Sequence, residues 1–292
     1  MTNKLPKVTI VTVCYNAADS IQKTMESVLN QNYPNIEYLI IDGASTDQTL
    51  VIIEQMKTAF TKKGIDFRCY SEKDRGIYDA MNKGIQQATG KWINFMNSGD
   101  GFYASDVLMK TFQDDPAENL LYGDTIFQMS FGDILLKPKN IDCLQKHMVF
   151  CHQSVFIPTQ EMKDYPFGLQ YRIAGDYKFF YDYYRRGGSF RYLGYTVAYF
   201  ESENGLSSSN SLQAHKENAQ IRLEHLSPVW QIKYQFKCAS YHFKEFMKGF
   251  FPKPLVESVR AWNYRRKMRR RIYKQNIEQI KQGLYDRHIR SV

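Results

Sequence analysis

The stretch Lys91-Trp92-Ile93-Asn94-Phe95-Met96-Asn97-Ser98-Gly99-Asp100 decides the fold of this chain. Its first six residues form a short, largely apolar run, which predicts a buried strand. Ligands bind beyond the carboxyl ends of the strands in an open parallel sheet, so Asn97 and Asp100 are expected to face a site. The Asp100 carboxylate suits Mg²⁺ or Mn²⁺, and the Asn97 amide can bond a ligand hydroxyl. The last four residues also have the composition of a turn that caps the next helix, so that alternative is open.

Around this stretch, apolar strands alternate with amphipathic helices. Strands are predicted over 8–13, 36–41 and 65–70, and helices over 20–29 and 49–59. The first strand is β-branched throughout, as expected where both faces of a parallel sheet are covered. This βαβαβ order predicts an α/β fold with right-handed connections. A helix over 104–112 and strands over 119–128 and 134–137 are predicted to follow.

The usual phosphate-binding motifs are missing from this half. No G-x-G-x-x-G follows the first strand, and residues 84–91 do not have the spacing G-x-x-x-x-G-K-[ST]. This excludes a standard dinucleotide site and a P-loop. A bound nucleotide would need another source of positive charge for its phosphates, and a metal ion at the end of the 91–96 strand would supply it.

Composition limits the class of protein. Hydrophobic residues make up 43% of the 292 residues and charged residues 24%, which is typical of a folded globular chain. The five cysteines have no C-x-x-C pair, which argues against a disulfide framework or a zinc site. There is neither a signal peptide nor an apolar run of about 18 residues. We therefore expect a cytoplasmic protein without a membrane span.

The net charge of +9 is concentrated at the C-terminus. Residues 229–292 contain 16 Lys or Arg against 4 Asp or Glu, whereas the first 228 residues contain 23 against 26. This shift predicts a catalytic domain over 1–225 and a basic helical tail over 226–292.

Four motifs carry a resemblance to a known family. They are Val13-Cys14-Tyr15-Asn16, Asp42-Gly43-Ala44-Ser45-Thr46-Asp47, the segment from Glu72 to Gly84, and Asn97-Ser98-Gly99-Asp100. In this order and spacing, the chain resembles family 2 glycosyltransferases of the GT-A fold, closest to the branch that builds bacterial surface polysaccharides. The resemblance covers about residues 7–210, and it implies that about residues 1–100 bind the donor and about residues 101–225 the acceptor. It implies a Rossmann-like half, a mixed central sheet flanked by helices, and inverting transfer of a hexosyl group from a UDP-sugar to a saccharide acceptor that is carried on a lipid.

The resemblance also implies a donor site. Tyr15 and Asn16 would lie under the nucleotide, and Asp42 would bond the uracil or ribose. Asp74, Arg75 and Gly76 would close over the base and diphosphate. The full implied set is Tyr15, Asn16, Asp42, Asp74, Arg75, Gly76, Asn82 and Asn97. Helix capping by Asp42 or Asp47, and a surface position for Arg75, are the alternatives.

The chain departs from the family at its metal motif. Many members have Asp-x-Asp where this chain has Asn97-Ser98-Gly99-Asp100, so one carboxylate remains. The implied Mn²⁺ or Mg²⁺ would rest on Asp100 and the diphosphate and bind weakly. A metal-independent variant stays open.

The second half supplies the implied base. A strand is predicted over 150–156, and its His152 and Gln153 resemble a pair that contacts the donor sugar or lines the acceptor pocket; a structural histidine is the alternative. Asp176 matches the last residue of the family's Glu-Asp motif, at the start of a predicted helix, although Gly175 replaces the Glu. An inverting transfer needs one base for the acceptor hydroxyl, and one carboxylate suffices. Helix capping is the alternative role for Asp176.

The C-terminal segments are expected to act at a membrane. Residues 203–210 resemble the family's flexible lid. Helices are predicted from Pro228 to about residue 251 and over about 255–282, with aromatic residues beside clustered Arg. This pattern favours an anionic membrane surface on the inner face of the cell membrane. Packing on the body or on a second copy of the chain is the alternative, and no nucleic-acid partner is expected.

Two other functions fit parts of the sequence. A nucleotidyltransferase acting on a sugar phosphate would use similar metal chemistry, but it should place basic residues near the first strand to grip a triphosphate. The segment after that strand, residues 14–22, contains no Lys or Arg. A nucleic-acid-binding protein could use the basic tail. Its binding would survive loss of Asp100 and Asp176 and fail without the tail's basic residues.

Overall fold

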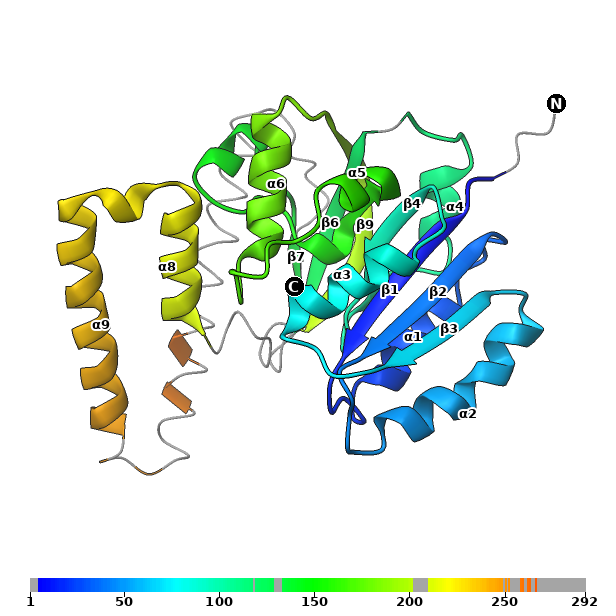
Figure 1. Cartoon of the computed structure of the whole chain (residues 1–292), viewed down its shortest axis with the longest axis horizontal. Helices are drawn as coiled ribbons and strands as arrows, with labels where there is room; N and C mark the ends of the chain where they lie inside the picture. Colours follow the sequence, from blue (N-terminus) through cyan, green and yellow to red (C-terminus); the bar gives the residue numbers. More distant parts are fainter. Residues whose placement is uncertain are drawn as a thin grey trace. The chain divides into compact units, whose positions relative to one another are not determined.

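The computed structural model describes residues 5–117, 119–128, 133–201 and 210–248, with a few residues between 250 and 266. The chain divides into two compact units, Met1–Glu224 and His225–Val292. The first unit begins with alternating strands and helices (Figure 1), as predicted for each element except the helix Ile77–Gln87, which the sequence analysis did not single out. These elements are β1 (Val8–Cys14), α1 (Ile21–Leu29), β2 (Ile36–Asp42), α2 (Thr49–Lys62), β3 (Asp66–Ser71), α3 (Ile77–Gln87) and β4 (Trp92–Phe95).

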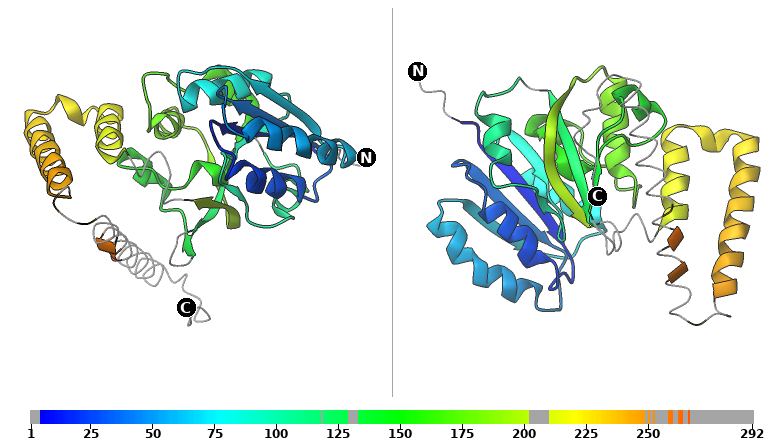
Figure 2. Two further views of the ribbon diagram at one scale, coloured as in Figure 1. Left: turned by 90° about the horizontal axis from the view of Figure 1, so that it is seen from below. Right: turned by 180° about the vertical axis from the view of Figure 1, so that it is seen from behind.

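The first four strands form a parallel sheet in the order β3-β2-β1-β4. Every residue of β1 and β2 is buried because helices cover both faces (Figure 2). Alternate residues of β1 enter different cores. Val11 and Val13 pack in a cluster with residues of α3, whereas Val8 and Ile10 pack with residues of α1 and α2. Because the four strands are parallel, their carboxyl ends share one edge of the sheet. Asn16, Asp42 and Asn97 lie at this edge.

The second half extends this sheet with strands of mixed direction. Within the described residues, the sheet has nine strands in the order β3-β2-β1-β4-β8-β6-β9-β5, with β7 paired to β6. The added strands are β5 (Gly101–Phe102), β6 (Leu120–Gln128), β7 (Ile134–Leu136), β8 (Val155–Pro158) and β9 (Phe190–Glu201). The added helices are α4 (Val107–Phe112), α5 (Thr159–Asp164), α6 (Gly175–Arg185) and α8 (Ser211–Ile221). This arrangement confirms the predicted α/β class with a mixed central sheet.

One predicted strand is partly wrong. The expected strand over 150–156 begins only at Val155, because His152–Ser154 form a single 3-10 turn, η2. The polar side chains of this turn bond to other polar groups instead of lying in a regular strand. Strand β8 then pairs antiparallel with β4, which brings the turn beside the carboxyl edge of the parallel sheet.

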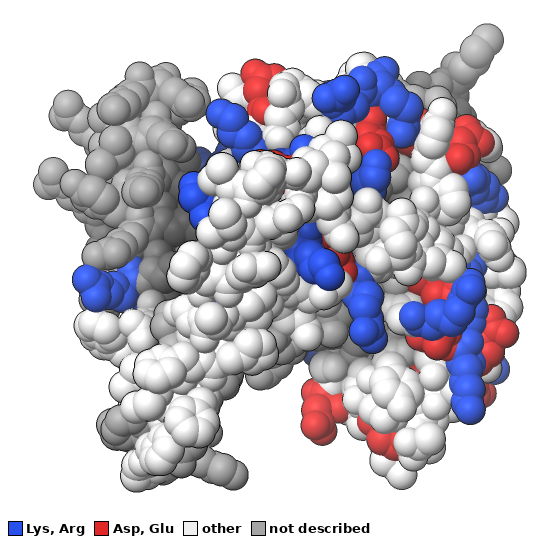
Figure 3. All heavy atoms as spheres, turned by 60° about the vertical axis from the view of Figure 1, so that its left-hand side comes forward, with Lys and Arg blue, Asp and Glu red and all other residues white. Residues whose placement is uncertain are grey.

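The second unit contains α9 (Pro228–Lys248), where the first tail helix was predicted. Most of the second predicted helix, over 255–282, and residues 203–209 of the predicted lid lie outside the described residues. None of the helices that the structure describes has the length and apolarity needed to cross a bilayer. Acidic and basic side chains are intermixed at the right of Figure 3, in keeping with the near-neutral balance of the first 228 residues.

Candidate active site

The loop after β1 is tied to the loop after β2. Asn16 adopts a left-handed backbone conformation (φ 47°), and its backbone N–H donates to Ser45 Oγ at 2.8 Å. The Thr46 backbone N–H donates to Asn16 Oδ1 at 2.9 Å. The neighbouring Tyr15 side chain is exposed and lines a cavity. Asn16 therefore fixes the loop that presents Tyr15.

Asp42 ends β2 and is fully buried. Its Oδ2 accepts hydrogen bonds from Ser45 N at 2.9 Å and Ser71 Oγ at 2.6 Å, so it joins the ends of β2 and β3. The helix-capping alternative applies to Asp47, whose Oδ1 accepts from Thr49 N at 3.0 Å at the start of α2. Asp42 thus shapes the edge of the cavity, and its contact with a base or ribose stays a prediction.

A cavity of about 590 Å³ lies at this edge. One wall contains the end of β1 and the start of α3, including Tyr15, Asp74, Arg75 and Gly76. The other wall is formed by residues between 169 and 173 together with Asn210 and Gln213. Four of the predicted donor-binding residues therefore line one cavity.

Local geometry explains two glycines of this wall. Gly76 has a φ of 123°, a conformation that favours glycine, and its N–H donates to Asp74 Oδ1 at 2.9 Å. A Cβ on Gly43 would lie 2.6 Å from Asp74 Oδ2, so only glycine allows Asp74 to approach this closely. These glycines hold Asp74 at the cavity.

Arg75 is one of two arginines that line the cavity, and Arg172 lies on the other wall. Arg75 Nη2 lies 3.1 Å from Asp79 Oδ1, and this hydrogen bond lowers the pKa of Asp79. The Arg75 side chain is 75% exposed, which agrees with the alternative that it occupies a surface position. An exposed ion pair contributes little to stability, so the guanidinium can turn toward an anion at small cost.

Asn82 does not line this cavity. Its Nδ2 donates to Phe167 O and its Oδ1 accepts from Phe167 N, both at 2.9 Å. This paired contact fixes the start of the segment that forms the opposite wall. A direct contact between Asn82 and a donor stays a prediction.

Asp100 is a buried carboxylate with neutral hydrogen-bond donors. Its side chain is 4% exposed. Gln153 Nε2 donates to Oδ2 at 2.8 Å, and Glu201 N donates to Oδ1 at 3.3 Å. Burial raises the pKa of Asp100 to about 7, because these donors do not offset the loss of water.

Asn97 supplies a second oxygen near the end of β4. Its Nδ2 lies 3.2 Å from His152 Nε2, while its buried Oδ1 has no hydrogen-bond partner among the described residues. An unpaired amide oxygen and an undercompensated carboxylate are hard donors that fit Mg²⁺ or Mn²⁺. No group of three His, Cys, Asp or Glu side chains suited to a metal occurs in the described part of the chain. A cation here would need oxygens from a substrate.

Asp176 lies in the first turn of α6, whose N-cap is Ala174, so Asp176 is not the cap. Tyr177 N donates to Asp176 Oδ1 at 2.7 Å, and Tyr78 Oη lies 3.1 Å from the same oxygen. Burial raises the pKa of Tyr78 well above 10, so its hydroxyl stays a donor. Oδ2 lies 3.4 Å from His152 Nδ1, and the side chain is partly exposed. A proton acceptor is therefore held in place but open to a ligand.

Tyr78 also explains the replacement of the family's Glu by Gly175. A Cβ on Gly175 would lie 2.8–2.9 Å from the Tyr78 ring. The ring therefore occupies the space that a side chain at position 175 would need. Tyr78 lies within the motif from Glu72 to Gly84, but the sequence did not predict it as a site residue.

Two adjacent residues of the turn η2 contact the two carboxylates. His152 lies beside Asp176, and the next residue, Gln153, bonds Asp100. Asp100 and Asp176 are far apart in sequence, yet adjacent residues of one turn hold them. Contacts of His152 and Gln153 with a sugar stay predictions.

Comparisons with known proteins identify the family of this chain. The model of the family described as "Glycosyl transferase family 2" matches residues 9–148. A PGL/p-HBAD biosynthesis glycosyltransferase of Mycobacterium bovis is 30% identical over 187 residues, which are 60% of this chain and 68% of that protein. The putative teichuronic acid biosynthesis glycosyltransferase TuaG of Bacillus subtilis is 39% identical over 103 residues, which are 34% of this chain and 38% of TuaG.

Two solved structures share the fold. S. aureus TarS 1-349 in complex with UDP-GlcNAc has a TM-score of 0.58 at 18% identity, covering 75% of this chain and 71% of that one. The mannosyltransferase PcManGT from Pyrobaculum calidifontis, in complex with GDP-Man and Mn²⁺, has a TM-score of 0.59 at 16% identity, covering 77% and 65%. At these identities the likeness concerns the fold.

Proposed function

The chain belongs to glycosyl transferase family 2 and has the GT-A fold, and we propose that it moves a sugar from a UDP-sugar to a saccharide acceptor with inversion. The observation that carries the proposal is the turn η2, whose adjacent residues His152 and Gln153 contact Asp176 and Asp100 respectively. A proton acceptor and a cation ligand are the two groups that such a transfer requires.

The cavity is the proposed nucleotide site. Tyr15 would contact the base, and Arg75 would turn from Asp79 to the diphosphate. Gly76 and Ile77 also line the cavity at the start of α3. The N-terminus of an α-helix carries partial positive charge and favours phosphate, which would replace the missing phosphate loop. TarS and PcManGT were solved with UDP-GlcNAc and GDP-Man, which supports a nucleotide sugar as the donor class.

Asp176 is the proposed base. An acceptor hydroxyl attacks the anomeric carbon from the side opposite the diphosphate, and its proton passes to Asp176 Oδ2. The new bond joins the acceptor oxygen to the anomeric carbon, while the bond from that carbon to the diphosphate breaks and UDP leaves. Tyr78 and His152 keep the carboxylate turned toward the reacting hydroxyl.

Asp100 and Asn97 would hold a divalent cation together with the diphosphate. When bound, Mg²⁺ or Mn²⁺ neutralises charge on the leaving diphosphate. Asp100 provides the single protein carboxylate, so we expect weak metal binding without nucleotide. The mannosyltransferase PcManGT was solved with Mn²⁺, which supports this class of cofactor.

Two relatives are described as acting in PGL/p-HBAD and teichuronic acid biosynthesis. These names support a role in building a cell-surface glycan, with a lipid-linked saccharide as the acceptor. The proposed location is the cytoplasmic face of the cell membrane, where such an acceptor is anchored.

Helix α9 is the proposed membrane contact. Its residues Val229, Ile232, Phe236, Phe243 and Phe246 are exposed, Phe236 by 74%, and their spacing places them on one face of the helix. The other face of the helix, which carries Trp230, Tyr234, Cys238 and Tyr241, is less exposed. Exposed aromatic side chains in a basic tail favour an interfacial helix on anionic lipid.

Calorimetric titration tests the donor site. We expect wild-type protein to bind UDP more tightly than GDP, with a further gain from Mn²⁺ that Asp100→Asn removes. Asp124→Asn is the matched control, because Asp124 is also 4% exposed but bonds Tyr192 instead of Gln153. Absence of nucleotide binding, or an equal metal response in both variants, would contradict the assignment.

Vesicle sedimentation tests the membrane contact. Replacing Phe236 and Phe243 with Ser should lower the affinity for phosphatidylglycerol vesicles at least about tenfold, because each buried Phe contributes roughly 1.5–3 kcal/mol. Cys238→Ser, on the other face, should leave it unchanged. If the double Ser variant loses self-association but still binds vesicles, the exposed face of α9 is a dimer contact. If the protein binds RNA but not vesicles, the tail has a nucleic-acid role.

A further inference from the structure

Glu217 is a fully buried acid on α8 that the sequence analysis did not single out. Its carboxylate accepts three consecutive backbone N–H groups, from Arg172 at 2.9 Å, Ile173 at 2.9 Å and Ala174 at 2.8 Å. Gln213, one turn earlier on α8, donates Nε2 to the same carboxylate at 2.8 Å. The buried charge is therefore satisfied by four donors.

These N–H groups belong to the turn that begins α6. The first N–H groups of an α-helix have no partner inside the helix, and a side chain at the N-cap usually binds one of them. The N-cap here is Ala174, which has no polar side chain. Glu217 instead binds the N–H of this N-cap residue and of the two residues before it, so it anchors the segment that leads into α6, next to the positively polarised helix N-terminus.

The segment 172–174, which Glu217 holds, connects the cavity to Asp176. Arg172 and Ile173 line the cavity, as does Gln213 on α8. Tyr78 Oη lies 2.8 Å from Ile173 O and 3.1 Å from Asp176 Oδ1, so α3 holds the same turn from its carbonyl side. Asp176 follows two residues after the last N–H that Glu217 binds.

We propose that Glu217 is a positioning residue for the transfer reaction. It fixes the turn 172–174, and thereby the direction in which Asp176 meets the acceptor hydroxyl. This inference rests on the proposed function, in which Asp176 is the base. Glu217 is buried and does not line the cavity, and the proposed nucleotide contacts Tyr15, Arg75 and Gly76 lie on the wall opposite the segment that it holds. Its main effect is therefore expected on the rate of transfer, with a small effect on nucleotide affinity.

Glu217→Gln tests this role with little change of shape. The substitution puts an NH₂ group where one carboxylate oxygen was, so at least one backbone N–H of the turn loses its acceptor. We expect kcat to fall about 10- to 100-fold, because small misplacement of a reacting group has effects of this size. The dissociation constant for UDP should stay within about twofold of wild type.

Glu37→Gln is the matched control, because it makes the same change in another fully buried carboxylate that accepts a backbone N–H, from Thr89. Both variants are assayed below their melting temperatures. The inference is supported if only Glu217→Gln lowers kcat. It is overturned if folded Glu217→Gln keeps the wild-type kcat, if both variants lose kcat in proportion to stability, or if UDP affinity falls with kcat.

Amide hydrogen exchange provides a readout without turnover. Glu217→Gln should speed exchange at residues 172–174 at least about tenfold, while Glu37→Gln leaves these amides unchanged. If wild-type protein binds UDP but transfers no sugar, the proposed function fails, and exchange still decides whether Glu217 holds the turn. Unchanged exchange in Glu217→Gln would overturn the inference whatever the activity.

Discussion

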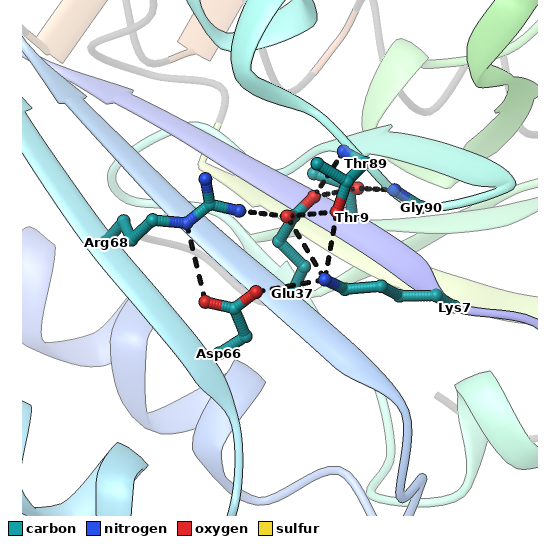
Figure 4. A network of polar contacts seen from close by, with 7 residues as sticks. All are labelled: Lys7, Thr9, Glu37, Asp66, Arg68, Thr89 and Gly90. Carbon is teal, nitrogen blue, oxygen red and sulfur yellow. Dashed lines mark hydrogen bonds and ion pairs between the residues drawn. The ribbon is translucent and has the colours of Figure 1, made fainter.

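Glu37 and Asp100 are buried carboxylates at opposite ends of the parallel sheet, and their surroundings differ. Glu37 lies near the start of β2, within hydrogen-bonding reach of Lys7, Thr9, Arg68 and Thr89 (Figure 4). Burial alone would raise the pKa of Glu37, but hydrogen bonds from Thr89 and Thr9 and the charge of Lys7 lower it below 4.5. Asp100 has only neutral hydrogen-bond donors, and burial raises its pKa to about 7.

The difference separates a structural carboxylate from a functional one. Glu37 forms ion pairs with Lys7 and Arg68 and ties the first three strands together, so its negative charge stabilises the fold. At the carboxyl edge, the charge of Asp100 is left undercompensated, and Asp176 is partly exposed. A buried carboxylate with a raised pKa, such as Asp100, is typical of functional sites, whereas compensated networks hold structure. Removing a charge at the carboxyl edge, at Asp100 or Asp176, should therefore lower activity. Removing the charge of Glu37 at the opposite edge should lower stability.

The largest effect is expected from Asp176→Asn. The amide cannot take the acceptor proton, so kcat should fall about 10²- to 10⁴-fold, the usual contribution of a general base. Stability should change by less than about 1 kcal/mol, because Asn keeps an oxygen for Tyr78 and Tyr177. Steady-state transfer assays and urea unfolding measure the two quantities. A variant with wild-type kcat would contradict the role of Asp176.

Glu37→Gln should give the opposite result. Removing one member of a buried ion pair typically costs about 3–5 kcal/mol, because the remaining charges lose their partner. We expect the free energy of unfolding in urea to fall by about 3 kcal/mol, with kcat within about twofold of wild type at a temperature where the variant is folded. A large loss of kcat in fully folded protein would show that the two edges are not independent.

Tyr78→Phe should have a smaller effect on catalysis. The phenyl ring still fills the space beside Gly175, but the hydrogen bond to Asp176 is lost. A hydrogen bond to a charged group contributes about 1.5–3 kcal/mol, so we expect kcat to fall roughly tenfold. Phe167→Leu is a control on a ring that packs against Tyr78 without bonding Asp176. Equal losses in both variants would assign the effect to packing.

Most of the first half of the fold could be predicted because β1, β2 and β4 are largely apolar and α1 and α2 are periodic. Strand β9 was missed because most of its residues are only partly buried, which weakens the alternation that marks a strand. Helix α8 was missed because it is largely polar, so its sequence lacks a clear apolar face. In both cases burial in the tertiary structure outweighs the local pattern.

The site could be predicted only in part. Asp100 and Asp176 carry motif signals, but their common support by His152 and Gln153 depends on pairing between β4 and β8, which no local pattern encodes. Tyr78 has the sequence appearance of a core aromatic residue. Glu217 lies on a polar helix, where an acid is usually a surface charge, and only the fold shows that it is buried against three N–H groups.

Acid should narrow the stability difference between wild type and Glu37→Gln. Because the pKa of Glu37 is lower in the folded protein than its ordinary 4.5, the charged form stabilises the fold above that value. This contribution is lost as the pH falls through the folded pKa. Urea unfolding at pH 6 and at successive values below 4.5 should therefore show wild type losing more stability than the variant. A gap that stays constant would mean that shape, and not charge, makes Glu37 structural, and the contrast with Asp100 would then fail.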